Sequence, residues 1–215
     1  MSSGVLAPDA VQAMFDRISP IYDPMNRLMT AGLDRRWRRL AVSRVVRPGD
    51  RVLDACCGTG DLALAAEEAG GTVTGLDFSQ RMLERARHKS STVEWVRGDA
   101  MALPFEDGTF DTVVSTLVLC TVPDPEVALR EIHRVLKPGG RLLFMEHIRS
   151  ESARWARWQD RLNAPWRAFA EGCNCNRATL DMLARSPFGP GAVERGSFRA
   201  MVPLIRPLAV GAAVA

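Results

Sequence analysis

The stretch "VLDACCGTGDLALAAEEAGGTVTGLDFS" (residues 52–79) decides the fold of this chain. Its first apolar run ends at an acid, a loop with two glycines follows, and an alanine-rich helical pattern leads into a second apolar run. A buried strand, a tight glycine turn and a helix in this order predict a βαβ unit in which a ligand approaches the backbone of the turn. The adjacent Cys56 and Cys57 lack the spacing of a zinc site, so we interpret them as space-filling residues of the loop and expect no metal.

The same alternation of strands and helices continues along the chain. We expect strands at residues 51–55, 72–77, 92–99, 110–119 and 140–147, and helices at 61–69, 79–89 (with Ser79 as N-cap) and 124–136. Outside this core we expect helices within 9–47, broken at Pro20, Pro24 and Gly32, a helix at 153–172 broken at Pro165, a helix at 176–186 capped by Asn176, and closing strands at 192–200 and 207–215. The order indicates an α/β fold with an open, mostly parallel sheet.

The composition is that of a globular protein with a full core, since 47% of the residues are hydrophobic and 25% are charged. The formal net charge of +3 does not indicate nucleic acid as a partner. We interpret the basic cluster "RRWRR" (residues 35–39) as the solvated face of a helix with Trp37 turned inward. The first residues lack the pattern of a signal peptide and no apolar run approaches the ~20 residues that span a bilayer, so we predict a cytoplasmic protein.

Three acids, Asp54, Asp77 and Asp99, stand at the ends of predicted strands. Ligands of open α/β sheets bind beyond the carboxyl ends of the strands, so these acids and the glycine loop predict a site for an adenosine-containing cofactor. Asp77 is placed to accept hydrogen bonds from ribose hydroxyls, and Asp99 to meet an adenine amino group. The run "GTGDLA" (58–63) also fits a dinucleotide motif, but the acid before the glycines and the lack of hydride-transfer residues argue against a nicotinamide cofactor.

Four motifs resemble the cofactor motifs of the class I S-adenosylmethionine-dependent methyltransferases: "VLDACCGTGD" (52–61), "GLDFSQRMLERAR" (75–87), "GDAMALPFEDGTFDTVV" (98–114) and "ALREIHRVLKPGGRL" (128–142). The resemblance implies a Rossmann-like fold whose seven-stranded sheet has an antiparallel last strand and helices on both faces. It implies one domain over residues 1–215, with a helical cap (9–47), a cofactor-binding core (51–147) and an acceptor-site segment (153–215). The residues that it assigns to S-adenosylmethionine are Tyr22, Asp54, Ala55, Cys56, Gly58, Gly60, Asp77, Phe78, Asp99, Ala100 and Thr116.

Two narrower resemblances concern the acceptor. The segment "FDRISPIYDPMNRLMTAGLDRRWRR" (15–39) resembles the amino-terminal signature of the quinone C-methyltransferases, whereas "STLVLCTVPDP" (115–125) and parts of the chain up to residue 188 resemble the thiol S-methyltransferases of animals. Together they imply a small apolar acceptor, a thiol sulfur first and a quinol or phenol ring as the alternative. Nitrogen acceptors stay open, as does a cofactor-binding protein without turnover.

Tyr22 and His147 are the predicted catalytic residues, because Tyr22 lies in the "YDPMN" signature and His147 follows the fifth strand. A thiol is already partly ionised, whereas methylation of a quinol carbon requires a general base that removes a phenolic proton. We expect Cys120, Trp155 and Trp158 to contact the acceptor.

The segment 154–170 places Trp155, Trp158, Leu162 and Phe169 on one apolar face, and its arginines elsewhere. This face has three interpretations: it packs into the core, it forms a lid over the acceptor pocket, or it contacts a membrane surface.

Overall fold

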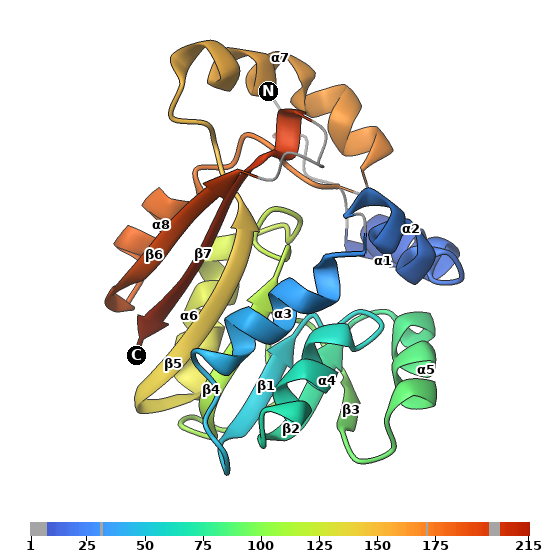
Figure 1. The fold of residues 1–215 in the computed structure, drawn as a ribbon, viewed down its shortest axis with the longest axis vertical. Helices are drawn as coiled ribbons and strands as arrows, with labels where there is room; N and C mark the ends of the chain where they lie inside the picture. Colours follow the sequence, from blue (N-terminus) through green and yellow to red (C-terminus); the bar gives the residue numbers. More distant parts are fainter. Residues whose placement is uncertain (1–7, 31, 171, 198–202) are drawn as a thin grey trace.

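A computed structural model describes residues 8–30, 32–170, 172–197 and 203–215, and its centre is one seven-stranded sheet of order β3-β2-β1-β4-β5-β7-β6 (Figure 1). The strands are β1 (Arg51–Ala55), β2 (Thr72–Asp77), β3 (Glu94–Arg97), β4 (Phe110–Thr116), β5 (Leu136–His147), β6 (Gly189–Ser197) and β7 (Pro207–Val214). Strands β1 to β5 pair in parallel, and β7 runs antiparallel between β5 and β6. The predicted α/β sheet with an antiparallel last strand is confirmed.

Helices cover both faces of the sheet. They are α1 (Pro8–Ile18), α2 (Tyr22–Met29), α3 (Asp34–Ser43), α4 (Asp61–Glu68), α5 (Gln80–Lys89), α6 (Pro125–Val135), α7 (Ala153–Phe169) and α8 (Thr179–Arg185), with a 3-10 turn η1 (Pro203–Ile205). Apolar side chains of α3 and α4 form one buried cluster with the sheet, and those of α6 and α8 form another on the opposite face. Among the described helices, none combines the length and apolarity that crossing a bilayer requires.

Two helix starts follow directly from local sequence. The Ser79 side chain accepts the Met82 N–H at the start of α5, as predicted, and the Asp124 carboxylate accepts two N–H groups at the start of α6. Each cap satisfies donors that the first turn of a helix leaves without an intrahelical partner.

Three predicted features of the helices are wrong. Pro24 lies in the first turn of α2, where a proline loses no helical hydrogen bond. Pro165 lies inside α7, and the helix continues to Phe169 although the Arg161 carbonyl loses its intrahelical donor. Asn176 does not cap α8, because its amide donates to Asp160 at 3.0 Å while Ala178 holds the cap position.

Candidate active site

A cavity of about 300 Å³ lies at the carboxyl ends of β1, β2 and β4 beneath α1 and α2, and we call it the main cavity because most of the residues assigned to the cofactor line it. Eight of the residues assigned to the cofactor line it: Tyr22, Cys56, Gly58, Asp77, Phe78, Asp99, Ala100 and Thr116. Residues that the sequence reasoning missed also line it: Val11, Gln12, Phe15, Met101, Leu117, Val118, Thr121, Val122 and Pro123. A signal for the first three was present, because positions 11, 12 and 15 share one face of a helix.

The glycine loop turns sharply at the floor of this cavity. Gly58 adopts a φ of +54°, and a Cβ at this position would lie 3.7 Å from the Tyr22 ring. Cys56 also has a positive φ, +61°, which is uncommon for a residue with a side chain and marks a backbone held by its surroundings. The loop therefore presents its backbone, with little side-chain bulk, to whatever occupies the cavity.

Gly60 and Cys57 pack against neighbouring side chains and do not line the main cavity. A Cβ on Gly60 would lie 2.6 Å from the Trp95 ring. The same ring approaches Gly75, where an added Cβ would also lie 3.2 Å from the Cys57 sulfur. Cys57 is buried, as expected for a space-filling thiol. Gly60 is therefore needed for close contact between the loop and Trp95, and it does not line the cavity.

Asp77 joins β2 to the glycine loop. Its carboxylate accepts the Gly58 N–H at 2.8 Å and the Ser79 N–H at 2.9 Å, and burial raises its pKa to about 6. Each carboxylate oxygen has a second lone pair, so Asp77 can still accept from a ligand in the cavity. Asp99 is exposed at the other end of the cavity and accepts the Met101 N–H at 2.8 Å. Both acids are thus held by backbone donors.

Asp54 and Ala55 lie beneath the loop and do not line the cavity. Asp54 is 1% exposed, and among the residues that the structure describes its Oδ2 has no hydrogen-bond partner. Burial raises the pKa of this carboxyl to about 8. The register of the sheet pairs Asp54 with Gly75, so Asp54 lies two residues deeper in the sheet than Asp77 and is covered by the loop.

The amino-terminal helices close the cavity through aromatic and polar contacts. Phe15 packs edge-on against Tyr22 and Phe78, with ring centroids 6.4 and 5.8 Å apart. Lys89 of α5 binds the carboxylates of Asp23 in α2 and Asp61 in α4, each at 2.7 Å. These contacts fix α1 and α2 over the glycine loop.

Glu146 positions the loop between β4 and α6. It is fully buried and accepts the N–H groups of Val118, Leu119 and Cys120 at 2.8, 2.9 and 3.2 Å. Burial raises the pKa of its carboxyl well above the ordinary value. The residue before this triad, Leu117, has a φ of +59° and lines the main cavity. The sequence offered no sign of this role beyond the place of Glu146 next to His147.

His147 lines a second, smaller cavity of about 60 Å³, and not the main one. The two cavities share Thr116 and Leu117 as walls, so His147 lies just beyond the cofactor side of the site. The His147 Nδ1 lies 3.5 Å from the Cys173 sulfur, and no described residue bonds its buried Nε2. The remaining lining residues of the small cavity are Asn26, Thr30, Asp34, Trp37, Arg38, Met145, Ile205 and Leu208.

Cys120 is buried and lines neither cavity. Its sulfur, the Cys173 sulfur and a His147 ring nitrogen lie within 4.8 Å of one another, a cluster that the sequence spacing did not reveal. The cluster offers three ligands, whereas structural zinc sites use four.

The predicted acceptor contacts Trp155 and Trp158 lie elsewhere. Each is 46% exposed on α7, in an apolar groove that shares no residue with either cavity. The interpretation of this face as core packing is therefore wrong for Trp155 and Trp158, and neither residue lines the main or the small cavity. The side of α7 that faces the protein carries Gln159 instead, which is 1% exposed.

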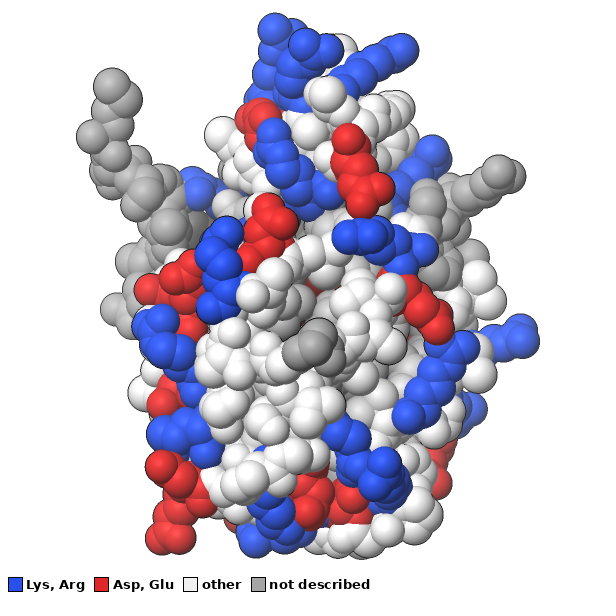
Figure 2. All heavy atoms as spheres, turned by 90° about the vertical axis from the view of Figure 1, so that its left-hand side faces the viewer, with Lys and Arg blue, Asp and Glu red and all other residues white. Residues whose placement is uncertain are grey.

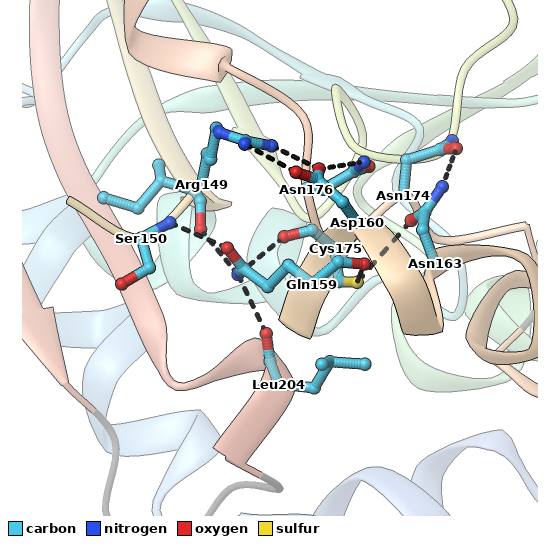
Figure 3. A network of polar contacts seen from close by, with 10 residues as sticks. Arg149, Ser150, Gln159, Asp160, Asn163, Asn174, Cys175, Asn176 and Leu204 are labelled. Carbon is cyan, nitrogen blue, oxygen red and sulfur yellow. Dashed lines mark hydrogen bonds and ion pairs between the residues drawn. The ribbon is translucent and has the colours of Figure 1, made fainter. Parts of the chain in front are cut away.

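Gln159 is the anchor of α7 (Figure 3). Its amide nitrogen donates to the carbonyls of Cys175 at 2.8 Å and Leu204 at 3.0 Å, and its oxygen accepts the Ser150 N–H at 2.8 Å. Asp160 beside it binds the Arg149 guanidinium, with one N–O distance of 2.7 Å. A polar side chain thus takes the buried position because carbonyls from distant segments converge on it.

Comparisons with known proteins relate this geometry to chemistry. Residues 4–158 match the ubiE/COQ5 methyltransferase family. A 2-phytyl-1,4-naphtoquinone methyltransferase of Synechococcus elongatus is 44% identical over 191 residues, which cover 82% of this chain and 82% of that protein. A demethylmenaquinone methyltransferase of Lactiplantibacillus plantarum is 47% identical over 146 residues, 63% of this chain and 62% of the relative.

Solved structures share the fold at lower identity. The [4+2]-cyclase SpnF superposes with a TM-score of 0.78 at 23% identity, covering 98% of this chain and 96% of the cyclase. An S-adenosylmethionine-dependent methyltransferase of Thermotoga maritima superposes with a TM-score of 0.72 at 23% identity, covering 95% of this chain and 99% of its own. These likenesses concern the fold alone, since one fold hosts many activities.

Proposed function

Because the chain belongs to the ubiE/COQ5 methyltransferase family, we propose that this S-adenosylmethionine-dependent methyltransferase methylates a ring carbon of a lipid-soluble quinol. Relatives that are more than 40% identical carry the names of naphthoquinone and menaquinone methyltransferases. The quinol was the alternative expectation of the sequence, and it now precedes the thiol acceptor. The amino-terminal signature is therefore the better guide to the acceptor than the C-terminal resemblance.

The residues around the main cavity fit S-adenosylmethionine. The Asp77 carboxylate retains lone pairs for the ribose hydroxyls, and Asp99 and Ala100 lie where an adenine base can stack and bond. The bare backbone at Gly58, where a side chain would approach Tyr22, leaves room for the amino-acid part of the cofactor. When bound, the cofactor supplies a methyl group on a sulfonium, already activated for in-line attack.

The observation that carries the proposal is the contact between the two cavities at Thr116 and Leu117. An acceptor that reaches this junction has the cofactor site on one side and His147 on the other. The accessible surface of the small cavity is mostly apolar, although the Asp34–Arg38 ion pair also lies in its wall, and this surface suits a quinol ring better than a charged acceptor.

His147 is the proposed general base. If its Nδ1–H faces the Cys173 sulfur, its Nε2 is left unprotonated as a proton acceptor, and the His147 side chain lines the small cavity. Removal of a phenolic proton raises electron density at the ring carbon that attacks the methyl group. Tyr22, over the glycine loop, is proposed to align the acceptor and the cofactor.

The test is transfer of a labelled methyl group to a short-chain demethylated naphthoquinol, with the oxidised quinone and a panel of thiols in parallel. We expect a C-methylated product from the quinol and none from the quinone. The variants His147→Asn and Tyr22→Phe should bind S-adenosylmethionine normally and lower the transfer rate by about 10²-fold or more. Transfer to thiols alone, or variants as fast as the wild type, would contradict the proposal.

A further inference from the structure

Helix α7 carries a contiguous exposed apolar surface. Trp155 and Trp158 are each 46% exposed and Leu162 is 40% exposed, all within two helical turns. They adjoin Pro165, Trp166, Pro203 and Leu204 in an almost wholly apolar groove, and we call these seven residues the tryptophan face. Single exposed apolar residues are ordinary, but a continuous patch of this kind marks a surface with a partner.

A stripe of arginines borders the tryptophan face. At 100° per residue, Arg154, Arg157 and Arg161 fall side by side on the helix next to the strip formed by Trp158 and Pro165, and all three are exposed. Figure 2 shows a gathering of Lys and Arg at the end of the molecule where α7 lies in Figure 1. An apolar strip with tryptophans beside a basic stripe is complementary to the headgroup region of an anionic bilayer.

The orientation of this face is set by Gln159, which lies on the adjoining, buried side of the helix, about 40° around the axis from Trp155. Gln159 binds the carbonyls of Ile148, Cys175 and Leu204, so α7 cannot turn its tryptophans inward without breaking these buried bonds. The face is therefore presented to the outside as a fixed surface.

The tryptophan face also adjoins the small cavity. Leu204 lines the groove and its neighbour Ile205, in the same 3-10 turn, lines the cavity beside His147. Helix α2, whose Asn26 lines that cavity, exposes Leu28 to 84%, and Ile21 just before the helix is 58% exposed. A surface that covers α7 would thus lie next to η1, whose Ile205 lines the small cavity.

We propose that the tryptophan face and its arginine stripe dock the enzyme onto an anionic membrane surface, from which a lipid-soluble acceptor passes to the small cavity. The docking itself stands on α7 alone, whereas delivery of the acceptor rests on the proposed function. The arginines select anionic headgroups, and the tryptophans occupy the interface between headgroups and acyl chains.

The test is sedimentation with vesicles of phosphatidylcholine alone or with about 30% phosphatidylglycerol, without any quinol. The wild type should bind the anionic vesicles, and the variant Arg154→Gln/Arg157→Gln should bind them about 30-fold more weakly, since each arginine near an anionic surface contributes about fivefold. The matched control is Arg35→Gln/Arg36→Gln on α3, which should bind like the wild type. Trp155→Ala/Trp158→Ala should also lose binding while staying folded by circular dichroism, because neither side chain belongs to the buried core.

Each outcome is decisive. A wild type that ignores anionic vesicles, equal losses in the α7 and α3 variants, or a tryptophan variant that changes the oligomeric state in the absence of lipid would overturn the docking proposal. A protein that docks but leaves every quinol unmethylated would refute the proposed function and not the docking. If the α7 arginine and tryptophan variants methylate a short-chain quinol in buffer but not a long-chain quinol in vesicles, this result supports both the docking proposal and the proposed function.

Discussion

Asp54 should make the stability of this protein depend on pH in a direction opposite to that of most carboxylates. Its pKa of about 8 in the folded protein lies about 4 pH units above the ordinary value of 3.8, because burial disfavours the charged form. The folded state then keeps a proton that the unfolded chain releases. The contribution of the Asp54 carboxyl to the free energy of unfolding is fully present below pH 3.8 and is lost as the pH rises toward 8.

The size of the effect follows from the same two values. One pKa unit corresponds to about 1.4 kcal/mol, so the group lowers the free energy of unfolding by at most about 6 kcal/mol between pH 4 and 8. Asp54→Asn keeps the shape of the side chain and cannot ionise. We expect the free energy of unfolding of the variant, relative to that of the wild type, to increase by about 1 kcal/mol for each pH unit from about 5 to 8.

Urea unfolding followed by tryptophan fluorescence at four pH values across this range measures the difference directly. Asp77 and Glu146, whose pKa values burial also raises, are present in both proteins, so their contributions largely cancel. Asp181→Asn, at an exposed position on α8, is the matched control, and its free energy of unfolding should change with pH as that of the wild type does. Parallel profiles for Asp54→Asn and the wild type would refute the reasoning that this acid is buried and protonated.

Three further changes test the site. Asp77→Ala should weaken binding of S-adenosylmethionine by about 1–3 kcal/mol in calorimetry, through loss of a charge-assisted bond and of two loop contacts, and unchanged affinity would mean that the ribose lies elsewhere. Gly60→Ala should lower the free energy of unfolding by about 2–4 kcal/mol, because the new Cβ would meet an indole ring at 2.6 Å with a φ of +86°. Gly139→Ala has a positive φ but open space, so about 1 kcal/mol is expected there, and equal losses would disprove the steric argument. Lys89→Met should weaken binding of S-adenosylmethionine by about 1–3 kcal/mol, because α2 loses its ion pair to α5. Lys137→Met removes a more exposed ion pair and should leave this affinity unchanged. Similar effects of the two variants would contradict the inference that Lys89 holds α2 over the cavity.

Much of the cofactor half could be predicted because its signals are local. The apolar runs of β1 and β2, the glycine turn and the Ser79 cap each follow from neighbouring residues. The carboxyl ends of parallel strands meet at one edge of a sheet, so the positions of Asp77 and Asp99 in the chain placed them at one cavity.

The sequence could not predict which acids at the strand ends line the cavity. Asp54 and Asp77 both stand at the end of a strand, yet one turns beneath the loop and the other lines the cavity. The difference arises from the register between the two strands, which pairs Asp54 with Gly75 and leaves Asp77 two residues nearer the carboxyl edge of the sheet.

Helix α7 is the clearest case of a decision made by tertiary structure. The sequence determined that its apolar residues share one face, because helical spacing is a property of the backbone. Only the folded protein decided that Trp155 and Trp158 stay exposed, since carbonyls of Ile148, Cys175 and Leu204 converge on Gln159 and hold the adjoining side of the helix against the protein. Likewise, the meeting of His147 with Cys173 required two segments 26 residues apart to pack together. Periodicity states which residues lie together on an element, and the surroundings of that element decide what they touch.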